Sequence, residues 1–87
     1  MKFIVSKKSS VRAINLANVT DIMVSANYLV LTTTDGREEK FVYGTEKDLN
    51  ELFDTLMDWL ARGQESGVFD CDKTMEAIDY RRRNGID

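Results

Sequence analysis

The chain contains no proline and no histidine among its 87 residues, and it has only one cysteine. The absence of histidine removes the usual general base at neutral pH, the commonest metal ligand and the histidine partner of a catalytic serine or cysteine. One cysteine cannot form a disulfide within the chain, which agrees with a reducing compartment. The absence of proline argues against a disordered protein. These absences favour a non-enzymatic protein, and we expect no cofactor and no bound metal.

Long apolar runs are also missing. No run approaches the roughly 20 residues that cross a bilayer, and the apolar residues 1–5 are too few for the core of a secretory signal peptide. We therefore expect a cytoplasmic protein that makes no membrane contact.

Charge of one sign does not accumulate either, since the net charge is −3. Residues 1–44 carry six basic and four acidic groups (+2), residues 45–63 carry two and five (−3), and residues 64–87 carry four and six (−2). No segment is basic enough to bind nucleic acid through charge alone.

The one strongly amphipathic stretch covers residues 45–63, in which apolar residues recur at helical spacing. Its stripe consists of Leu49, Leu52, Phe53, Leu56 and Leu60, with Met57 and Trp59 at the margins. Thr45 is a favoured N-cap residue, and Asp48 three positions later completes a capping box. The sequence therefore predicts one long helix, with Leu56 at the centre of its buried face.

The first 44 residues contain five segments of β-forming residues separated by polar turns. The expected strands are residues 2–6, 11–16, 19–25, 28–34 and 37–43. Asp35-Gly36, between the last two, predicts a type I′ hairpin turn. Because all connections are short, neighbouring strands should be antiparallel. The predicted fold is α+β: an antiparallel meander of about five strands packed on one long amphipathic helix, plus a short C-terminal helix.

The predicted domain has two parts, a β-meander plus helix core at residues 1–63 and a linker with a short C-terminal helix at residues 64–87. Residues 64–67 form the linker, and the helix covers residues 72–83, with Asp72 as its cap and Asn84-Gly85 at its end. Met75 and Ile78 are the main apolar residues on the core-facing side of this helix, with Cys71 and Ala77 nearby. This stripe is weak, so the helix should dock lightly or require a partner.

The predicted sheet has apolar side chains on both faces. Leu29, Leu31, Phe41 and Tyr43 line the face toward the long helix, and other apolar residues lie on the opposite face. A sheet with one solvated face should be polar there, and a large exposed apolar patch is uncommon on a monomer. We therefore expect a homodimer, or a contact with another protein. Its candidate residues are Met23, Tyr28, Val30, Val42, Met75 and Ile78.

The leading functional hypothesis is a non-enzymatic protein-interaction or regulatory module of bacterial or phage type that self-associates. The alternative is a small nucleic-acid-binding module whose candidate residues are Lys7, Lys8, Arg81, Arg82 and Arg83. The acidic surroundings of the three arginines argue against this alternative.

The segment Asp70-Cys71-Asp72-Lys73-Thr74 matches the D-x-D-x-T string of haloacid-dehalogenase-type phosphatases. That motif must end a buried parallel strand and be followed by a large α/β domain, whereas only thirteen residues follow it here. Two aspartates at a helix N-terminus explain the string instead. The adjacent carboxylates disfavour the Cys71 thiolate, so the sequence predicts no catalytic residue.

Two family resemblances rest on strand and turn positions. The residues Ile14-Asn15-Leu16, Val19, Ile22, Leu29-Val30-Leu31 and Asp35-Gly36, followed by a helix, resemble the small FlbD/SwrD-type bacterial motility proteins. The stretch from Asn27 through Asp35-Gly36 to Leu52 resembles the opening half of LytTR DNA-binding domains. Both cover about residues 11–60 and imply a β-meander followed by a helix. The DNA-contacting half of LytTR domains has no counterpart here, and the FlbD pattern has no place for the last 24 residues, so neither resemblance transfers a functional residue.

Overall fold

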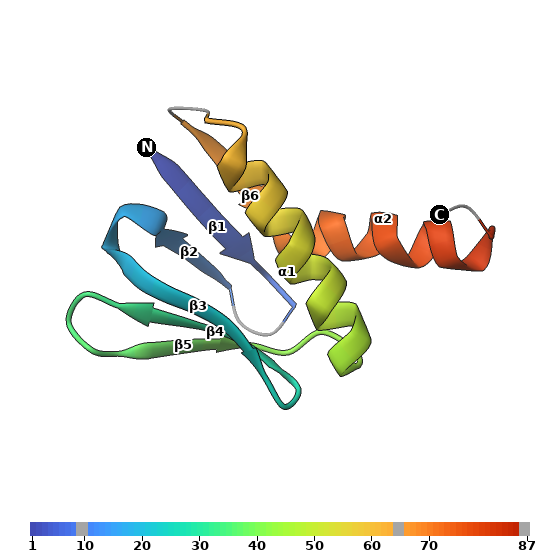
Figure 1. The fold of residues 1–87 in the computed structure, drawn as a ribbon, viewed down its shortest axis with the longest axis horizontal. Coiled ribbons are helices and arrows are strands. Elements are labelled where there is room, and N and C mark those ends of the chain that lie inside the picture. Colours follow the sequence, from blue (N-terminus) through green and yellow to red (C-terminus); the bar gives the residue numbers. More distant parts are fainter. Residues whose placement is uncertain (9–10, 64–65, 86–87) are drawn as a thin grey trace.

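A computed structural model of the chain describes residues 1–8, 11–63 and 66–85. The strands are β1 (Lys2–Ser6), β2 (Arg12–Asn15), β3 (Val19–Ser25), β4 (Tyr28–Thr33), β5 (Glu38–Phe41) and β6 (Gly67–Asp70). The helices are the 3₁₀ helix η1 (Leu16–Asn18), α1 (Glu46–Ala61) and α2 (Cys71–Arg83). The predicted α+β class, the five N-terminal strands and the long helix are confirmed. In Figure 1, β1 to β5 lie on the left, α2 lies on the right, and α1 lies between them.

The strands form two three-stranded sheets rather than one continuous meander. One has the order β2-β1-β6, and the other has the order β3-β4-β5. The break occurs at η1, where the side chain of Asn15 accepts a hydrogen bond from the Ala17 backbone at 3.0 Å and turns the chain. β1 pairs antiparallel with β2 and parallel with β6. The sequence did not predict β6, which begins inside the expected linker. Ser9, Ser10, Gln64 and Glu65, in the expected turn and linker, lie outside the described residues.

The predicted type I′ turn at Asp35-Gly36 is wrong, because that turn needs a positive φ at both residues. Only Gly36 has one, at 85°. The Gly36 backbone donates to the Thr33 carbonyl at 3.0 Å, and the Thr33 backbone donates to the Arg37 carbonyl at 2.8 Å. This is the three-residue hairpin loop in which glycine forms a bulge.

α1 begins as the sequence predicts. Thr45 is the N-cap, and its side chain accepts from the Asp48 backbone while the Asp48 carboxylate accepts from the Thr45 backbone. Leu49, Leu52 and Leu56 are fully buried. Both sheets and both helices contribute to the core that these leucines enter, which includes Ile4, Leu29, Leu31, Phe41, Tyr43, Phe69, Cys71, Met75 and Ile78.

α2 docks more firmly than its sequence predicts. Its N-cap is Asp70 rather than Asp72, because the Asp70 side chain accepts from the Lys73 backbone at 3.1 Å. Cys71, Met75 and Ile78 are all buried, at 0%, 7% and 1% exposure. The two predicted parts of the domain therefore share one core, and the expectation of a lightly docked helix is wrong.

Candidate interaction surfaces

The outer face of the β3-β4-β5 sheet carries four of the predicted contact residues. Met23, Tyr28 and Val42 are 44%, 40% and 45% exposed, as a contact surface requires. Val30 shares their face but is only 5% exposed, because it occupies the central strand between Met23 on β3 and Lys40 on β5. The face is mixed in character, since Lys40 lies over the Tyr28 ring with its nitrogen 5.5 Å from the ring centre.

Met75 and Ile78 are not at this surface. Both belong to the core cluster, with α2 packed against α1 and β1. Their helical spacing on α2 places them on its inner side, so they hold α2 to its own chain. The prediction that they lie near an intermolecular contact is therefore corrected.

The outer face of the β2-β1-β6 sheet is more apolar, and sequence reasoning missed it. In register across the three strands, Phe3 lies beside Asn15 and Val68, and Val5 lies beside Ala13 and Asp70. Phe3 and Val5 are partly exposed and are not among the residues packed on the core, whereas Ile4 between them is fully buried. Val68 is 61% exposed. The signal for this face is the run Phe3-Ile4-Val5, which is typical of a strand covered on both sides.

A partly buried polar cluster ties α2 to the end of β1. The hydroxyl groups of Ser6 and Tyr43 are hydrogen-bonded, and Tyr43 donates to the Asp72 carboxylate at 2.9 Å. The Lys7 backbone donates to the same carboxylate at 2.7 Å. Because the one Tyr43 proton goes to Asp72, Ser6 must be the donor to Tyr43. Burial raises the pKa of Tyr43 far above its ordinary value of 10.0, the Ser6 bond opposes this change, and the Asp72 bond adds to it.

The aspartates of the D-x-D-x-T string have structural roles. The string does follow a strand that is parallel to its neighbour, but Asp70 caps α2 and Asp72 binds Tyr43 and the Lys7 backbone. Cys71 between them is fully buried, and burial, aided by Asp72 and then Asp70, raises the pKa of its thiol to about 12. The thiolate is therefore scarce at neutral pH.

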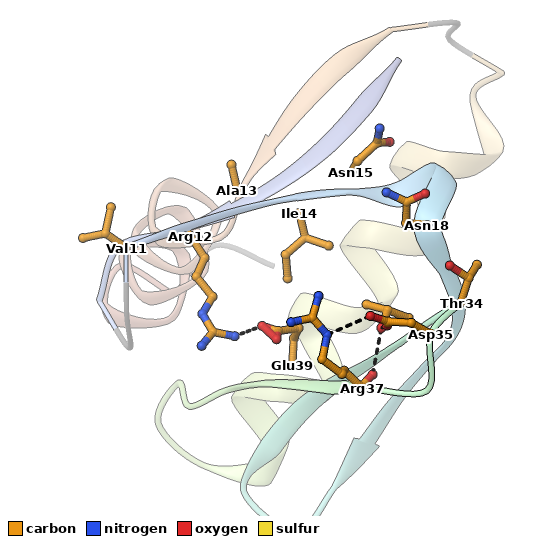
Figure 2. Close-up of a pocket in the computed structure, with 11 residues that line it drawn as sticks. Val11, Arg12, Ala13, Ile14, Asn15, Asn18, Thr34, Asp35, Arg37 and Glu39 are labelled. Carbon is orange, nitrogen blue, oxygen red and sulfur yellow. Dashed lines mark hydrogen bonds and ion pairs between the residues drawn. The ribbon is translucent and has the colours of Figure 1, made fainter.

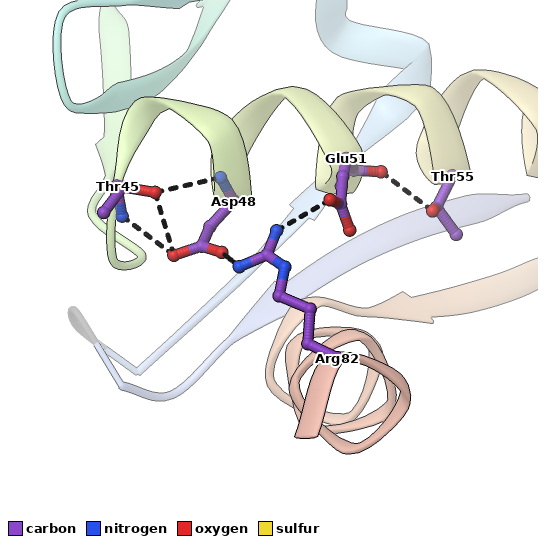
Figure 3. A network of polar contacts seen from close by, with 5 residues as sticks. All are labelled: Thr45, Asp48, Glu51, Thr55 and Arg82. Carbon is purple, nitrogen blue, oxygen red and sulfur yellow. Dashed lines mark hydrogen bonds and ion pairs between the residues drawn. The ribbon is translucent and has the colours of Figure 1, made fainter. Parts of the chain in front are cut away.

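A second polar cluster joins the two helices (Figure 3). Arg82 of α2 forms ion pairs with Asp48 and, at 2.7 Å, with Glu51 of α1. Asp48 is only 8% exposed and also accepts from the Thr45 backbone at 2.9 Å. This backbone bond is the main reason that the pKa of Asp48 lies below its ordinary value of 3.8, and Arg82 lowers it further against the opposing effect of burial.

We expect stability to fall in acid through Asp48. Its pKa is lower in the folded than in the unfolded chain, so the unfolded chain binds more protons below pH 3.8. The stabilisation by the Asp48 carboxylate is fully present above that pH and is lost as the pH falls through the pKa that Asp48 has in the folded chain. Urea unfolding at a series of pH values should show that the free energy of unfolding of Asp48→Asn falls less steeply with decreasing pH than that of the wild type. The control is Asp54→Asn, which removes an exposed charge from the same helix and should retain the wild-type dependence of the unfolding free energy on pH. The same dependence for all three proteins would contradict the prediction.

The basic residues of the nucleic-acid alternative are not brought together. Lys7 lies at the first turn of α2 through its bond to Asp72, whereas Arg81, Arg82 and Arg83 lie in the last turn. Arg81 lies nine positions after Asp72, which is about 14 Å along a helix. Arg82 is also occupied by two carboxylates. This arrangement gives no continuous basic surface along α2.

The described residues contain no helix long and apolar enough to cross a membrane, and among them no cluster of three or more His, Cys, Asp or Glu side chains is placed to hold a metal ion. Comparison of the chain with protein-family models, with curated proteins and with solved structures gives no match.

Proposed function

We propose that this chain is a non-enzymatic protein-interaction module of regulatory type, which associates with a second copy of itself through the outer face of the β2-β1-β6 sheet. The observation that carries the proposal is the apolar face formed by Phe3, Val5, Ala13 and Val68. Both helices contribute to the core on the opposite side of this sheet. All-parallel sheets are covered on both faces, and the β1-β6 pair of this mixed sheet is parallel. The exposed apolar face is therefore a candidate interaction site.

A second copy is the occupant that the charges favour. The chain carries a net charge of −3, so two copies repel each other in most orientations. Among the paired residues of this outer face only Asp70 is ionisable, and its carboxylate is engaged as the cap of α2. A two-fold contact would place this weakly charged, flat face against itself. The β3-β4-β5 face, in contrast, presents the charged residues Asp21, Glu38 and Lys40 beside its apolar centre.

The size of the face sets the expected affinity. Three strands spaced by about 4.8 Å, with about 3.3 Å per residue over five residues, give a flat area of roughly 14 by 16 Å. This area is well below the approximately 800 Å² per partner of a stable complex. We therefore expect a weak dimer that dissociates in the micromolar range or above.

Sedimentation equilibrium from about 10 µM to 1 mM tests this proposal in the affinity range set above. The average mass of the wild type should rise with concentration from 10.0 kDa toward twice that value. The average mass of Val68→Glu should stay at that of one chain, because dimerisation would bury the introduced charge in the contact. Tyr80→Glu, at an exposed apolar residue of α2, is the matched control and should still associate. A monomer at every concentration would refute self-association. A mass sensitive to Met23→Glu, but not to Val68→Glu, would move the contact to the β3-β4-β5 face.

A further inference from the structure

An open groove of about 720 Å³ separates β2 from the hairpin formed by β4 and β5 (Figure 2). This volume lies within the range of roughly 300–1,000 Å³ typical of ligand sites. One wall consists of the consecutive residues 11–15. The opposite wall carries Arg37 and Glu39, with Thr33 at the end of β4 and Thr34 and Asp35 of the hairpin loop.

The consecutive residues indicate that the edge of β2 borders the groove. Successive side chains of a strand point to opposite faces of its sheet, so Ala13 and Ile14 can both line one groove only where the strand edge faces it. Within the described part of the chain, β2 pairs only with β1 and β5 pairs only with β4. β2 therefore presents to the groove an edge of backbone donors and acceptors that no described strand satisfies. β5 and the residue before it line the groove only through the alternate residues Arg37 and Glu39, so side chains rather than a backbone edge face the groove there.

Arg12 of β2 and Glu39 of β5 form an ion pair that links the two strands (Figure 2). Both occupy the core-facing side of their sheets, because Arg12 is in register with buried Ser6 and Glu39 is in register with buried Leu31. Charged side chains that point inward on edge strands prevent unspecific strand pairing. A strand in the groove would remove this ion pair from water, which is costly unless the strand supplies further hydrogen bonds to the two charges. The pair therefore disfavours an apolar strand in the groove.

We propose that the groove binds an extended peptide segment of a partner protein, which pairs its backbone with the open edge of β2 and directs a polar side chain toward Arg12 and Glu39. Such a segment would add a fourth strand to the β2-β1-β6 sheet, with the backbone supplying affinity and alternate side chains supplying specificity. The lining has two arginines, Arg12 and Arg37, and two carboxylates, Asp35 and Glu39. This balance favours a peptide without a large excess of either charge.

The test is a selection of random seven-residue peptides on the purified chain. An enriched peptide is synthesised with and without methyl groups on alternate backbone nitrogens, and each form is titrated into ¹⁵N-labelled protein. The unmodified peptide should shift the amide signals of residues 11–15 and 37–39. Methylation of the nitrogens should weaken binding at least tenfold, since each lost hydrogen bond to the edge of β2 lowers affinity.

Val68→Glu is the control that separates this inference from the proposed self-association. Val68 lies on β6, on the far side of β1 from β2, so the variant should bind the peptide as the wild type does. The inference is overturned if no peptide is enriched, if the shifts map elsewhere, or if the methylated peptide binds equally well. Shifts of the same amides on concentrating the protein without peptide would overturn it in favour of a second copy in the groove.

Discussion

Leu56→Ala should lower the free energy of unfolding by about 2–5 kcal/mol. Leu56 is fully buried near the middle of α1, within the core cluster formed by both sheets and both helices. Truncation removes its transfer free energy and leaves a cavity, because neighbours from several elements cannot all relax into the space. Equilibrium urea denaturation measures the loss as a lower midpoint at constant slope.

Leu60→Ala is the matched control, since it makes the same chemical change on the same helix. Leu60 is only partly buried and lines an existing groove of about 310 Å³ between β3 and α1, together with Met57 and Ile22. Its truncation should therefore cost clearly less than that of Leu56. Equal losses at the two positions, or an unchanged midpoint for Leu56→Ala, would contradict the assignment of the buried face.

Gly44→Ala should cost about 1.5–4 kcal/mol, which is a large effect for one added methyl group. Gly44 has a φ of 58°, a left-handed conformation that costs an L-residue about 1–2 kcal/mol. A Cβ atom there would also lie 2.2 Å from Oδ2 of Asp48. Asp48 would have to move, and the capping box would be lost at a further cost of about 0.5–2 kcal/mol.

Gly36→Ala separates these two contributions. Gly36 also has a positive φ, at 85°, but nothing lies within 4 Å of the position that its Cβ would occupy. It should therefore show the conformational cost alone. In an Asp48→Ala background the Gly44→Ala loss should shrink to a similar value, as a double-mutant cycle in chemical denaturation would report. If Gly44→Ala lowers the free energy of unfolding by the same amount in that background, the contact with Asp48 is not the cause of the destabilisation.

The parts of the fold with strong local signals could be predicted from the sequence. The leucine stripe of α1 and its Thr45 cap determine a helix through contacts three and four residues apart. The five N-terminal strands follow from β-forming runs between polar turns. The alternation of apolar residues along the strands also predicts which side chains face α1. Those side chains are buried as expected: Leu29, Leu31, Phe41 and Tyr43.

The missed features depend on contacts between distant residues. β6 has only four residues, and its partner β1 lies at the other end of the chain, with Lys2 beside Gly67. Local periodicity carries no information about such pairing. The apolar stripe of α2 is short, but Asp72 at its start and Arg82 near its end attach it to β1 and α1. These polar attachments explain why three apolar residues suffice to bury one side of α2.

The candidate surfaces were only partly predictable for the same reason. Alternation along β3 and β4 correctly places Met23 and Tyr28 on an exposed face. The β2-β1-β6 face required knowledge that both helices pack on the other side of β1, which is a property of the whole fold. The groove at β2 and β5 exists because η1 divides the strands into two sheets, and a single meander would contain no such gap.

The most direct test of self-association through the β2-β1-β6 sheet is an isotope-filtered NOE experiment on a mixture of labelled and unlabelled chains, which detects only contacts between copies. We predict intermolecular contacts among the side chains of Phe3, Val5 and Val68 at millimolar concentration. Intermolecular contacts confined to Met23, Tyr28 and Val42, or none at all, would contradict it.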